Sequence, residues 1–137
     1  MFKPVFFTLQ ELVPQDLFES TKPADRDMLW FLFDERILIT NDGIRRRFGP
    51  MMANNWHKGG DKQLRGWRPG DTKTGAKLSQ HKFGRAVDLA PLKTTADEIR
   101  EDILKNPGRE EYRFITCMET GISWLHNDCR NWNRDKF

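Results

Sequence analysis

The sequence contains only two cysteines among its 137 residues, Cys117 and Cys129, and they do not form a C-x-x-C pair. Motifs that depend on closely paired cysteines are therefore excluded. Long apolar runs are also missing, since none approaches the roughly 20 residues that a membrane-spanning helix needs. The N-terminal segment lacks the sustained apolar core and the small-residue cleavage site of a signal peptide. We therefore expect no membrane span, synthesis in a cytoplasm, and two free, buried thiols.

A strong excess of one charge sign is absent as well. The chain has 23 basic and 20 acidic residues, which gives a net charge of +3. So small an excess does not by itself indicate a nucleic-acid partner, although it is compatible with an anionic polymer such as a bacterial cell wall. The basic run at 45–47 predicts a solvated helix face. The interpretation as a nucleic-acid-binding domain would rest only on that run and on a pI near 9.0.

The residues that are present suit one small domain with one core. Hydrophobic residues make up 37% of the chain and include five Trp and ten Phe, which is enough to fill a core. Thr8–Glu11 has the capping-box pattern of a helix start, and Pro14 is expected to end that turn. Residues 23–33 and 34–48 have helical apolar spacing, and Gly49 with Pro50 stops the second segment.

Beyond Pro50 the pattern changes to short strands around a long polar loop. We expect a strand at 51–56, a loop at 57–78, a strand at 85–89 and a helix at 95–104. Two more strands follow around a turn, at 112–118 and 122–126. The helix is expected to be capped by Thr94 or Thr95. Loops as long as 57–78 inside a compact domain are usually functional or disordered. The order of elements predicts an α+β fold, with a small antiparallel or mixed sheet flanked by helices.

Potential metal ligands are few, because the chain has only three histidines. His81 and Asp88 lie seven positions apart, so in one continuous strand their side chains would face opposite sides. Gly84 permits a bend between them, and sheet pairing could bring His126, near the end of a later strand, beside Asp88. Two imidazoles and one carboxylate suit zinc and leave one coordination position open for water, as in catalytic zinc sites.

The run Ser79–Asp88 fits the pattern S-x-H-x-x-G-x-A-x-D at every fixed position. It resembles the zinc D-alanyl-D-alanine carboxypeptidase family, which includes D-alanyl-D-alanine dipeptidases, phage L-alanyl-D-glutamate endopeptidases and, more distantly, the hedgehog signalling domain. Residues 124–128 match the later W-x-H or x-H-x-D segment of that family, and Gly66–Arg68 matches its G-[YW]-R segment. The resemblance covers roughly residues 50 to 130 and leaves the helical N-terminal third unmatched.

The resemblance implies a role for each matched residue. His81, Asp88 and His126 would bind Zn²⁺, and Arg68 would stabilise the developing oxyanion. Ser79 would hydrogen-bond the substrate or orient the His81 segment. Two further candidate substrate contacts are His57, outside these matches, and Trp67, the middle residue of the Gly66–Arg68 segment. His57 is either an ordinary loop histidine or a contact at the mouth of the cleft, and Trp67 is either a packing aromatic or a sugar-stacking platform.

The general base is the weakest part of the match. Several members of the family carry Glu or Asp three residues before the last histidine, where this chain has Ser123. Two carboxylates nearby remain as candidates. Glu119 lies beyond a predicted turn and could fold back over the metal, and Asp128 would face the same side of a strand as His126. Asp128 could instead be the partner that fixes a ligand imidazole.

Together these features predict a zinc metallopeptidase that hydrolyses a peptide bond in bacterial peptidoglycan. We expect one domain over residues 1–137, with 1–49 as its helical N-terminal part and 50–130 as its catalytic core. The partner would be a stem peptide, with no nucleic acid involved. A phage lysis enzyme would stay in the host cytoplasm until lysis and then act on the wall, whereas a virion-associated form would contact tail or capsid proteins. The alternative is a zinc-bearing module that has lost catalysis and binds the wall or a protein.

Overall fold

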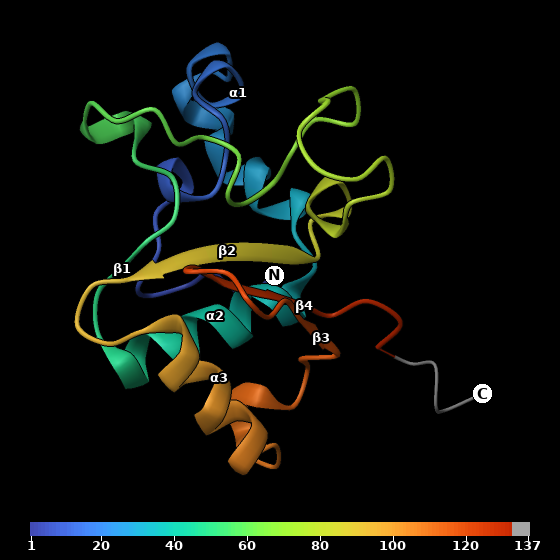
Figure 1. The fold of residues 1–137 in the computed structure, drawn as a ribbon. Coiled ribbons are helices and arrows are strands. Elements are labelled where there is room, and N and C mark those ends of the chain that lie inside the picture. Colours follow the sequence, from blue (N-terminus) through green and yellow to red (C-terminus); the bar gives the residue numbers. More distant parts are fainter. Residues whose placement is uncertain (133–137) are drawn as a thin grey trace.

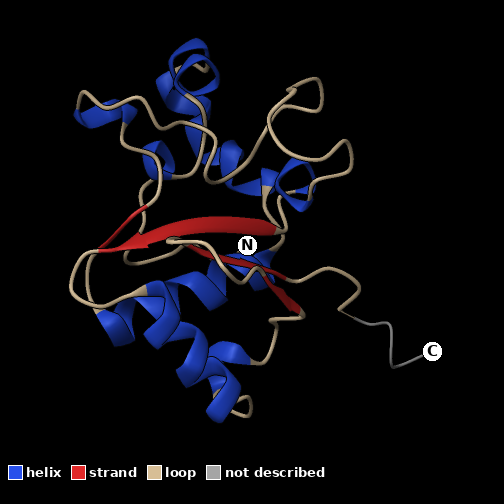
Figure 2. Cartoon of the chain, viewed as in Figure 1, coloured by secondary structure: helices blue, strands red, loops and turns tan. Residues whose placement is uncertain are grey.

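The computed structural model of the chain describes residues 1–132, and its architecture is α+β (Figure 1, Figure 2). Four strands form one antiparallel sheet in the order β1-β2-β4-β3. They are β1 (Met51–Met52), β2 (Ala86–Pro91), β3 (Cys117–Met118) and β4 (Leu125–Asp128). The predicted α+β class is confirmed, and the sheet is antiparallel rather than mixed. Among residues 1–132, no helix has the length and apolar character needed to cross a bilayer.

The α-helices are α1 (Gln15–Ser20), α2 (Glu35–Phe48) and α3 (Ala96–Lys105). Helices α2 and α3 lie on one side of the sheet, and the N-terminal segment with α1 and the long loop lie on the other (Figure 1). The side chain of Asp34 caps α2, and Gly49, with a φ of 87°, ends it. Thr95 and Glu98 form a capping box at the start of α3. The start and stop signals in the sequence therefore predicted these two helices correctly.

Other boundaries agree only in part with the predictions. The turn predicted at Thr8–Glu11 is a 3-10 helix at Leu9–Glu11 with the expected capping box, and it ends before Pro14. Pro14 also stands at the N-cap of α1, where its extended backbone allows a new helix to begin after it. Residues 23–32 form a long 3-10 helix. The strand predicted at 112–118 is confined to its last two residues, because a 3-10 helix at 110–112 and a turn at 113–114 take up its first part. The strand predicted at 122–126 is displaced to 125–128.

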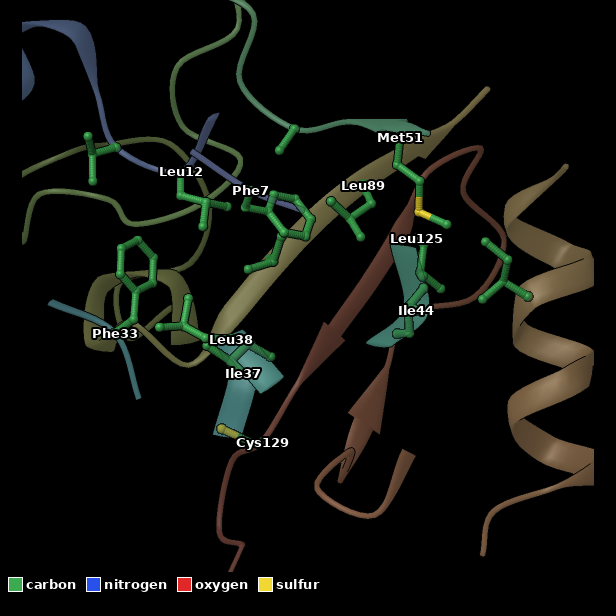
Figure 3. Close-up of a cluster of buried hydrophobic side chains, with 14 of the residues drawn as sticks. Phe7, Leu12, Phe33, Ile37, Leu38, Ile44, Met51, Leu89, Leu125 and Cys129 are labelled. Carbon is green, nitrogen blue, oxygen red and sulfur yellow. The ribbon is translucent and has the colours of Figure 1, made fainter. Parts of the chain in front are cut away.

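The hydrophobic core lies mainly between the sheet and α2 (Figure 3). Leu89 of β2 pairs in register with Leu125 of β4, and both are fully buried together with Ile44 of α2. Burying such side chains away from water is the main stabilising contribution to a domain of this size. The core also includes Phe7 and Leu12, so the N-terminal third packs into the same cluster as the sheet.

The N-terminal segment also fixes the position of the loop that follows β1. The backbone N–H of Trp67 donates to the carbonyl of Leu12 over 2.8 Å. A Cβ at Gly66 would lie 2.1 Å from that same carbonyl oxygen, so only glycine permits this close approach. The helical third that no motif explained therefore acts as a support for the loop that carries Arg68.

Candidate metal centre and cleft

The register of the sheet gathers the polar side chains on one face. Asp88 pairs directly with His126, and Asp128 pairs with Ala86 on one side and with Cys117 on the other. Residues directly opposite each other in an antiparallel sheet point to the same side. Because alternate residues of a strand also share a face, His126 and Asp128 lie beside Asp88 on the face opposite Leu125.

His81 reaches the same point from outside the sheet. It lies in a 3-10 helix at Gln80–Phe83, which Gly84 ends with a left-handed backbone at φ 64°. Its Nδ1 is 2.8 Å from the carbonyl oxygen of Gly66, an acceptor, so Nδ1 carries the proton. Nε2 faces Asp88, whose Oδ1 is 3.3 Å away, and it can present a lone pair to a metal ion when the ring is neutral. The bend that Gly84 was expected to provide is thus a tight helical turn rather than a strand bulge.

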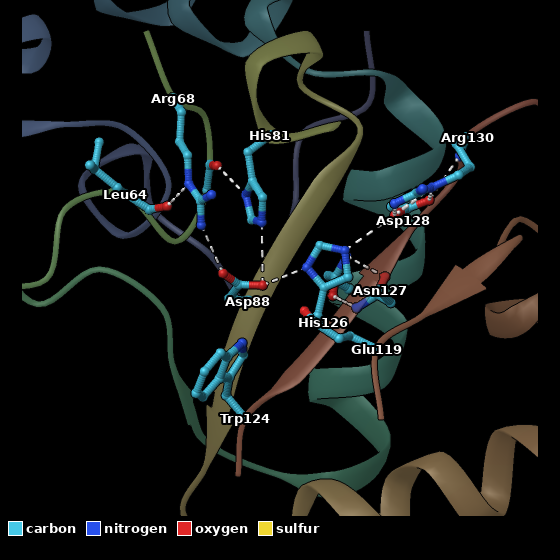
Figure 4. A network of polar contacts seen from close by, with 12 residues as sticks. Leu64, Arg68, His81, Asp88, Glu119, Trp124, His126, Asn127, Asp128 and Arg130 are labelled. Atoms are coloured by element: carbon cyan, nitrogen blue, oxygen red, sulfur yellow. Dashed lines mark hydrogen bonds and ion pairs between the residues drawn. The ribbon is translucent and has the colours of Figure 1, made fainter. Parts of the chain in front are cut away.

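His126 completes the trio (Figure 4). Its Nδ1 lies 2.7 Å from Oδ1 of Asp88, and its Nε2 lies 3.2 Å from Oδ2 of Asp128. One potential ligand atom from each of His81, Asp88 and His126 falls within 4.8 Å of the other two. With its Nε2–H donated to Asp128, His126 can present the lone pair of Nδ1. The residues present therefore fit a metal ion, with two imidazole nitrogens and one carboxylate oxygen as donors.

The charges of the trio are strongly coupled without a metal. Burial favours the neutral form of Asp88, but hydrogen bonds with His126 and His81 outweigh it and hold the pKa of Asp88 well below its ordinary value. For His126, burial lowers the pKa, yet hydrogen bonds with Asp128 and Asp88 raise it to about 9. Protonated His126 therefore takes the place that a cation would fill between the two carboxylates.

This coupling predicts how the stability of the metal-free chain depends on pH. The pKa of His126 rises from an ordinary 6.5 to about 9 on folding, so its stabilising contribution is complete below pH 6.5 and is lost as the pH rises through 9. We expect the free energy of unfolding in chelator to fall by up to about 3 kcal/mol between these values. Urea unfolding at both pH values measures it, and H126Q should flatten the dependence. An equal fall in H126Q would contradict this assignment.

Arg68 borders the trio from the loop before the Ser79–Asp88 motif. Its Nη2 lies 3.1 Å from Oδ2 of Asp88, and its Nε donates to the carbonyl of Leu64 over 2.6 Å. Burial lowers the pKa of Arg68, whereas the negative charges of Asp88 and Glu119 raise it. The guanidinium thus pairs with a candidate ligand and lines the same cleft as the candidate base Glu119.

The two candidate bases occupy different environments. Asp128 is fully buried, and its carboxylate accepts hydrogen bonds from His126 and from the Nε and backbone N–H of Arg130. Burial raises its pKa, but those bonds lower it to about 2. Glu119 is exposed, follows β3 directly and lines the cleft. A base needs a free oxygen that faces the substrate, which fits Glu119, while Asp128 fits the role of fixing an imidazole.

Replacing Asp128 by asparagine tests that second role. The amide would remove the charge-assisted bond to Nε2 of His126 and release its ring orientation, so we expect zinc affinity to fall about 10- to 100-fold. Binding at saturating zinc should still reach one ion per chain. Competition with a chromophoric chelator measures the affinity, and D16N, at an exposed position on α1, is the control. Unchanged affinity in D128N would show that Asp128 does not orient the ligand.

A cleft of about 500 Å³ opens over the trio. Ser79 and Trp124 line it with Glu119, and so does Cys117, which lies across from Asp128 in β3. Its wall residues come from the long loop, the sheet and the turn after β3, and they are Arg68, Thr74, Gly75, Ala76, Leu78, Ser79, Gln80, His81, Asp88, Cys117, Met118, Glu119, Trp124, His126 and Arg130. The predicted long loop is therefore one wall of the cleft.

Two predicted substrate contacts lie outside this lining. His57 sits in a short 3-10 helix with its ring 5.6 Å from that of Trp56, and Trp67 packs against the hydrophobic core. Both cysteines are free thiols. Cys129 is buried in the core as expected, but Cys117 is only half-buried at the cleft wall. No sequence motif distinguished Cys117, since its position follows from strand register alone.

Arg100, a buried residue that belongs to no sequence motif, holds the turn that bears Glu119 and Trp124. Arg100 of α3 donates to the backbone carbonyls of Glu119, Ile122 and Trp124 over 3.3, 2.7 and 3.0 Å. It is 5% exposed and also pairs with Asp97. These bonds satisfy carbonyls that strand pairing would otherwise use, which explains why β4 begins only at Leu125.

Compared with models of protein families, with curated proteins and with solved structures, the chain has no match.

Proposed function

We propose that the chain is a zinc-dependent peptidase that hydrolyses a peptide bond in bacterial peptidoglycan. The observation that carries the proposal is the convergence of His81, Asp88 and His126 at the base of a cleft. Arg68 and Glu119 on its walls add a cation and a carboxylate. The match of residues 79–88 to the zinc D-alanyl-D-alanine peptidase pattern supports the same chemistry, and a peptidase-like or hedgehog-like fold over one domain belongs to this proposal.

The proposed roles follow from the position of each side chain. A zinc ion held by the trio would supply a Lewis acid that polarises the scissile carbonyl and activates water near neutral pH. Glu119 takes the proton from the attacking water and returns it to the leaving amine. Arg68 offers its charge to the carbonyl oxygen as negative charge develops there. Asp128 holds the ring of His126, and Trp124 forms a wall against which a substrate can pack.

The biological setting proposed is phage lysis or a virion-associated wall hydrolase. It rests on the resemblance to small phage endopeptidases. In the first case the protein would wait in the host cytoplasm until the wall becomes accessible, and its partner would be the stem peptide. In the second, tail or capsid proteins would hold it in the particle.

One observation favours a second candidate, a zinc-bearing module that binds the wall without cutting it. Ser123 stands where several members of the family have a base, and it is exposed and absent from the cleft lining. Under this alternative the site would load zinc and bind stem peptides with no turnover. The difference therefore depends on Glu119, the carboxylate that the end of β3 brings to the cleft.

Mass spectrometry of fragments released from purified peptidoglycan tests the function directly. We expect the zinc-loaded chain to release a defined peptide, with new termini that identify the bond cut, and expect a chelator to abolish the release. Zinc added back should restore it. Protein shown to carry zinc that releases nothing from several wall chemotypes would contradict the peptidase and leave the binding module.

A further inference from the structure

A second hollow adjoins the cleft on the side of Arg68. It has a volume of about 500 Å³ and shares Arg68, Asp88 and Trp124 with the cleft. We call it the Arg65 pocket, and its lining includes Asp61, Lys62, Leu64 and Arg65 besides the shared residues. Because Asp88 belongs to both, a ligand that fills the cleft can continue past the trio into this pocket.

Arg65 is anchored beside the trio through its backbone. Its carbonyl accepts the backbone N–H of Asp88 over 2.8 Å, and its own N–H donates to Oδ1 of Asn54 over 2.9 Å. Asn54 is itself buried and tied to the carbonyl of Val13. The base of the Arg65 side chain is thus fixed relative to a candidate metal ligand, as a specific subsite requires.

Within residues 1–132, the guanidinium of Arg65 lacks a hydrogen-bond acceptor for one of its nitrogens. Its Nη1 is buried and has no hydrogen-bond partner among the described residues. A guanidinium is always charged and has only donors, so a buried donor without an acceptor is unfavourable. Because Arg65 also lines the pocket, an anionic ligand there would offset its unpaired charge, and a carboxylate matches the planar fork of an arginine.

The other cations of the pocket are already engaged. Arg68 donates to Asp88 and Leu64, and the Nζ of exposed Lys62 lies 3.5 Å from Asp61. Among the described residues, no carboxylate pairs with Arg65, in contrast to the other two cations of the pocket. A ligand with a single carboxylate satisfies it, and its place next to the cleft indicates a group on the same peptide.

We propose that the Arg65 pocket binds a carboxylate of the peptide substrate, on the opposite side of the trio from the wall formed by Cys117. This rests on the proposed function for its substrate and adds a specificity-determining residue that no motif marks. The peptide then lies across Asp88 and beside Trp124, with its acidic group at Arg65. The carboxylate is either the C-terminus of the peptide or an interior one, such as that of a D-glutamyl residue.

Binding of matched peptides separates these possibilities. Calorimetric titration of the zinc-loaded chain would use two pairs of short stem-peptide analogues. One pair differs as C-terminal carboxylate against amide, and the other as interior D-glutamyl carboxylate against its amide with a blocked C-terminus. We expect one pair to show tighter binding of the carboxylate member, and R65Q to weaken that member about 10- to 100-fold while leaving the amide unchanged. The pair that responds identifies the source.

Two variants keep the result interpretable. R65K retains the charge without the fork and should recover part of the loss, while K105Q, at an exposed position on α3 outside the pocket, should change binding less than about threefold. The proposed carboxylate binding would be contradicted if the unchanged chain showed no preference for the carboxylate peptide. It would also be contradicted if R65Q lost the same affinity for the carboxylate and amide peptides. Binding that depends on Arg65 but occurs without cleavage would support the carboxylate pocket and contradict the peptidase proposal. Cleavage that is unchanged in R65Q would support the peptidase and contradict the pocket.

Discussion

Glu119→Gln should lower the turnover number of the zinc-loaded chain by about 10²- to 10⁴-fold, the range that loss of a general base produces. Glutamine keeps the size and polarity of the side chain but cannot accept a proton at neutral pH. Glu119 contributes no ligand atom to the trio, and its side chain is exposed. Zinc affinity and the free energy of unfolding should therefore stay unchanged, so the loss would be confined to the chemical step.

The measurement is the rate of release of the peptide fragment identified for the unchanged chain, with zinc content determined on the same samples. E101Q is the matched control, since Glu101 is an exposed carboxylate on α3, and it should keep full turnover. Full turnover in E119Q would remove Glu119 from the mechanism. If D128N then lost turnover at saturating zinc, Asp128 would be the base in its place.

Gly84→Ala is the substitution for which we expect the largest loss of stability. Gly84 has a left-handed backbone at φ 64°, and a Cβ there would lie 1.8 Å from the carbonyl oxygen of Leu32. The carbonyl of Gly84 also accepts the backbone N–H of Asp34, so the two segments are tied together. Left-handed strain contributes about 1–2 kcal/mol and forced displacement of backbone about 1–3 kcal/mol.

We therefore expect G84A to lower the free energy of unfolding by about 3 kcal/mol or more, or to prevent folding altogether. Chemical denaturation of the metal-free chain measures it. G59A is the control, because Gly59 has a φ of 85° but no atom within 4 Å of its would-be Cβ, so it isolates the strain from the clash. Equal losses in the two variants would show that the contact with Leu32 is not what requires glycine.

Residues 79–88 show how far a local pattern leads. Their spacing predicted that His81 and Asp88 meet across a bend at Gly84, and the structure places the two side chains 3.3 Å apart. Helix α2 was predictable for a similar reason, since Asp34 and Gly49 act on backbone groups within one turn of them. Signals of this kind depend on neighbours in the sequence and do not require knowledge of the tertiary structure.

Features that depend on tertiary contact were not predictable in the same way. The limits of β4 follow from Arg100, which bonds to the carbonyls before Leu125 from a separate helix. The place of Cys117 in the cleft follows from its register with Asp128. The requirement for glycine at position 66 arises from Leu12, far away in the sequence. Propensity and periodicity contain no information on such partners.

The pairing of β2 with β4 also has a consequence for how the chain folds. Asp88 and His126 are 38 positions apart, and the buried pair Asn41 and Asn127 is separated by 86. Closing such long loops costs conformational entropy before any contact offsets it, so these contacts form slowly and late. The unfolded chain then offers no preassembled metal site, so under the proposed function zinc would bind the native state by preference. Metal supply would thus govern the lifetime of the folded chain as well as its chemistry.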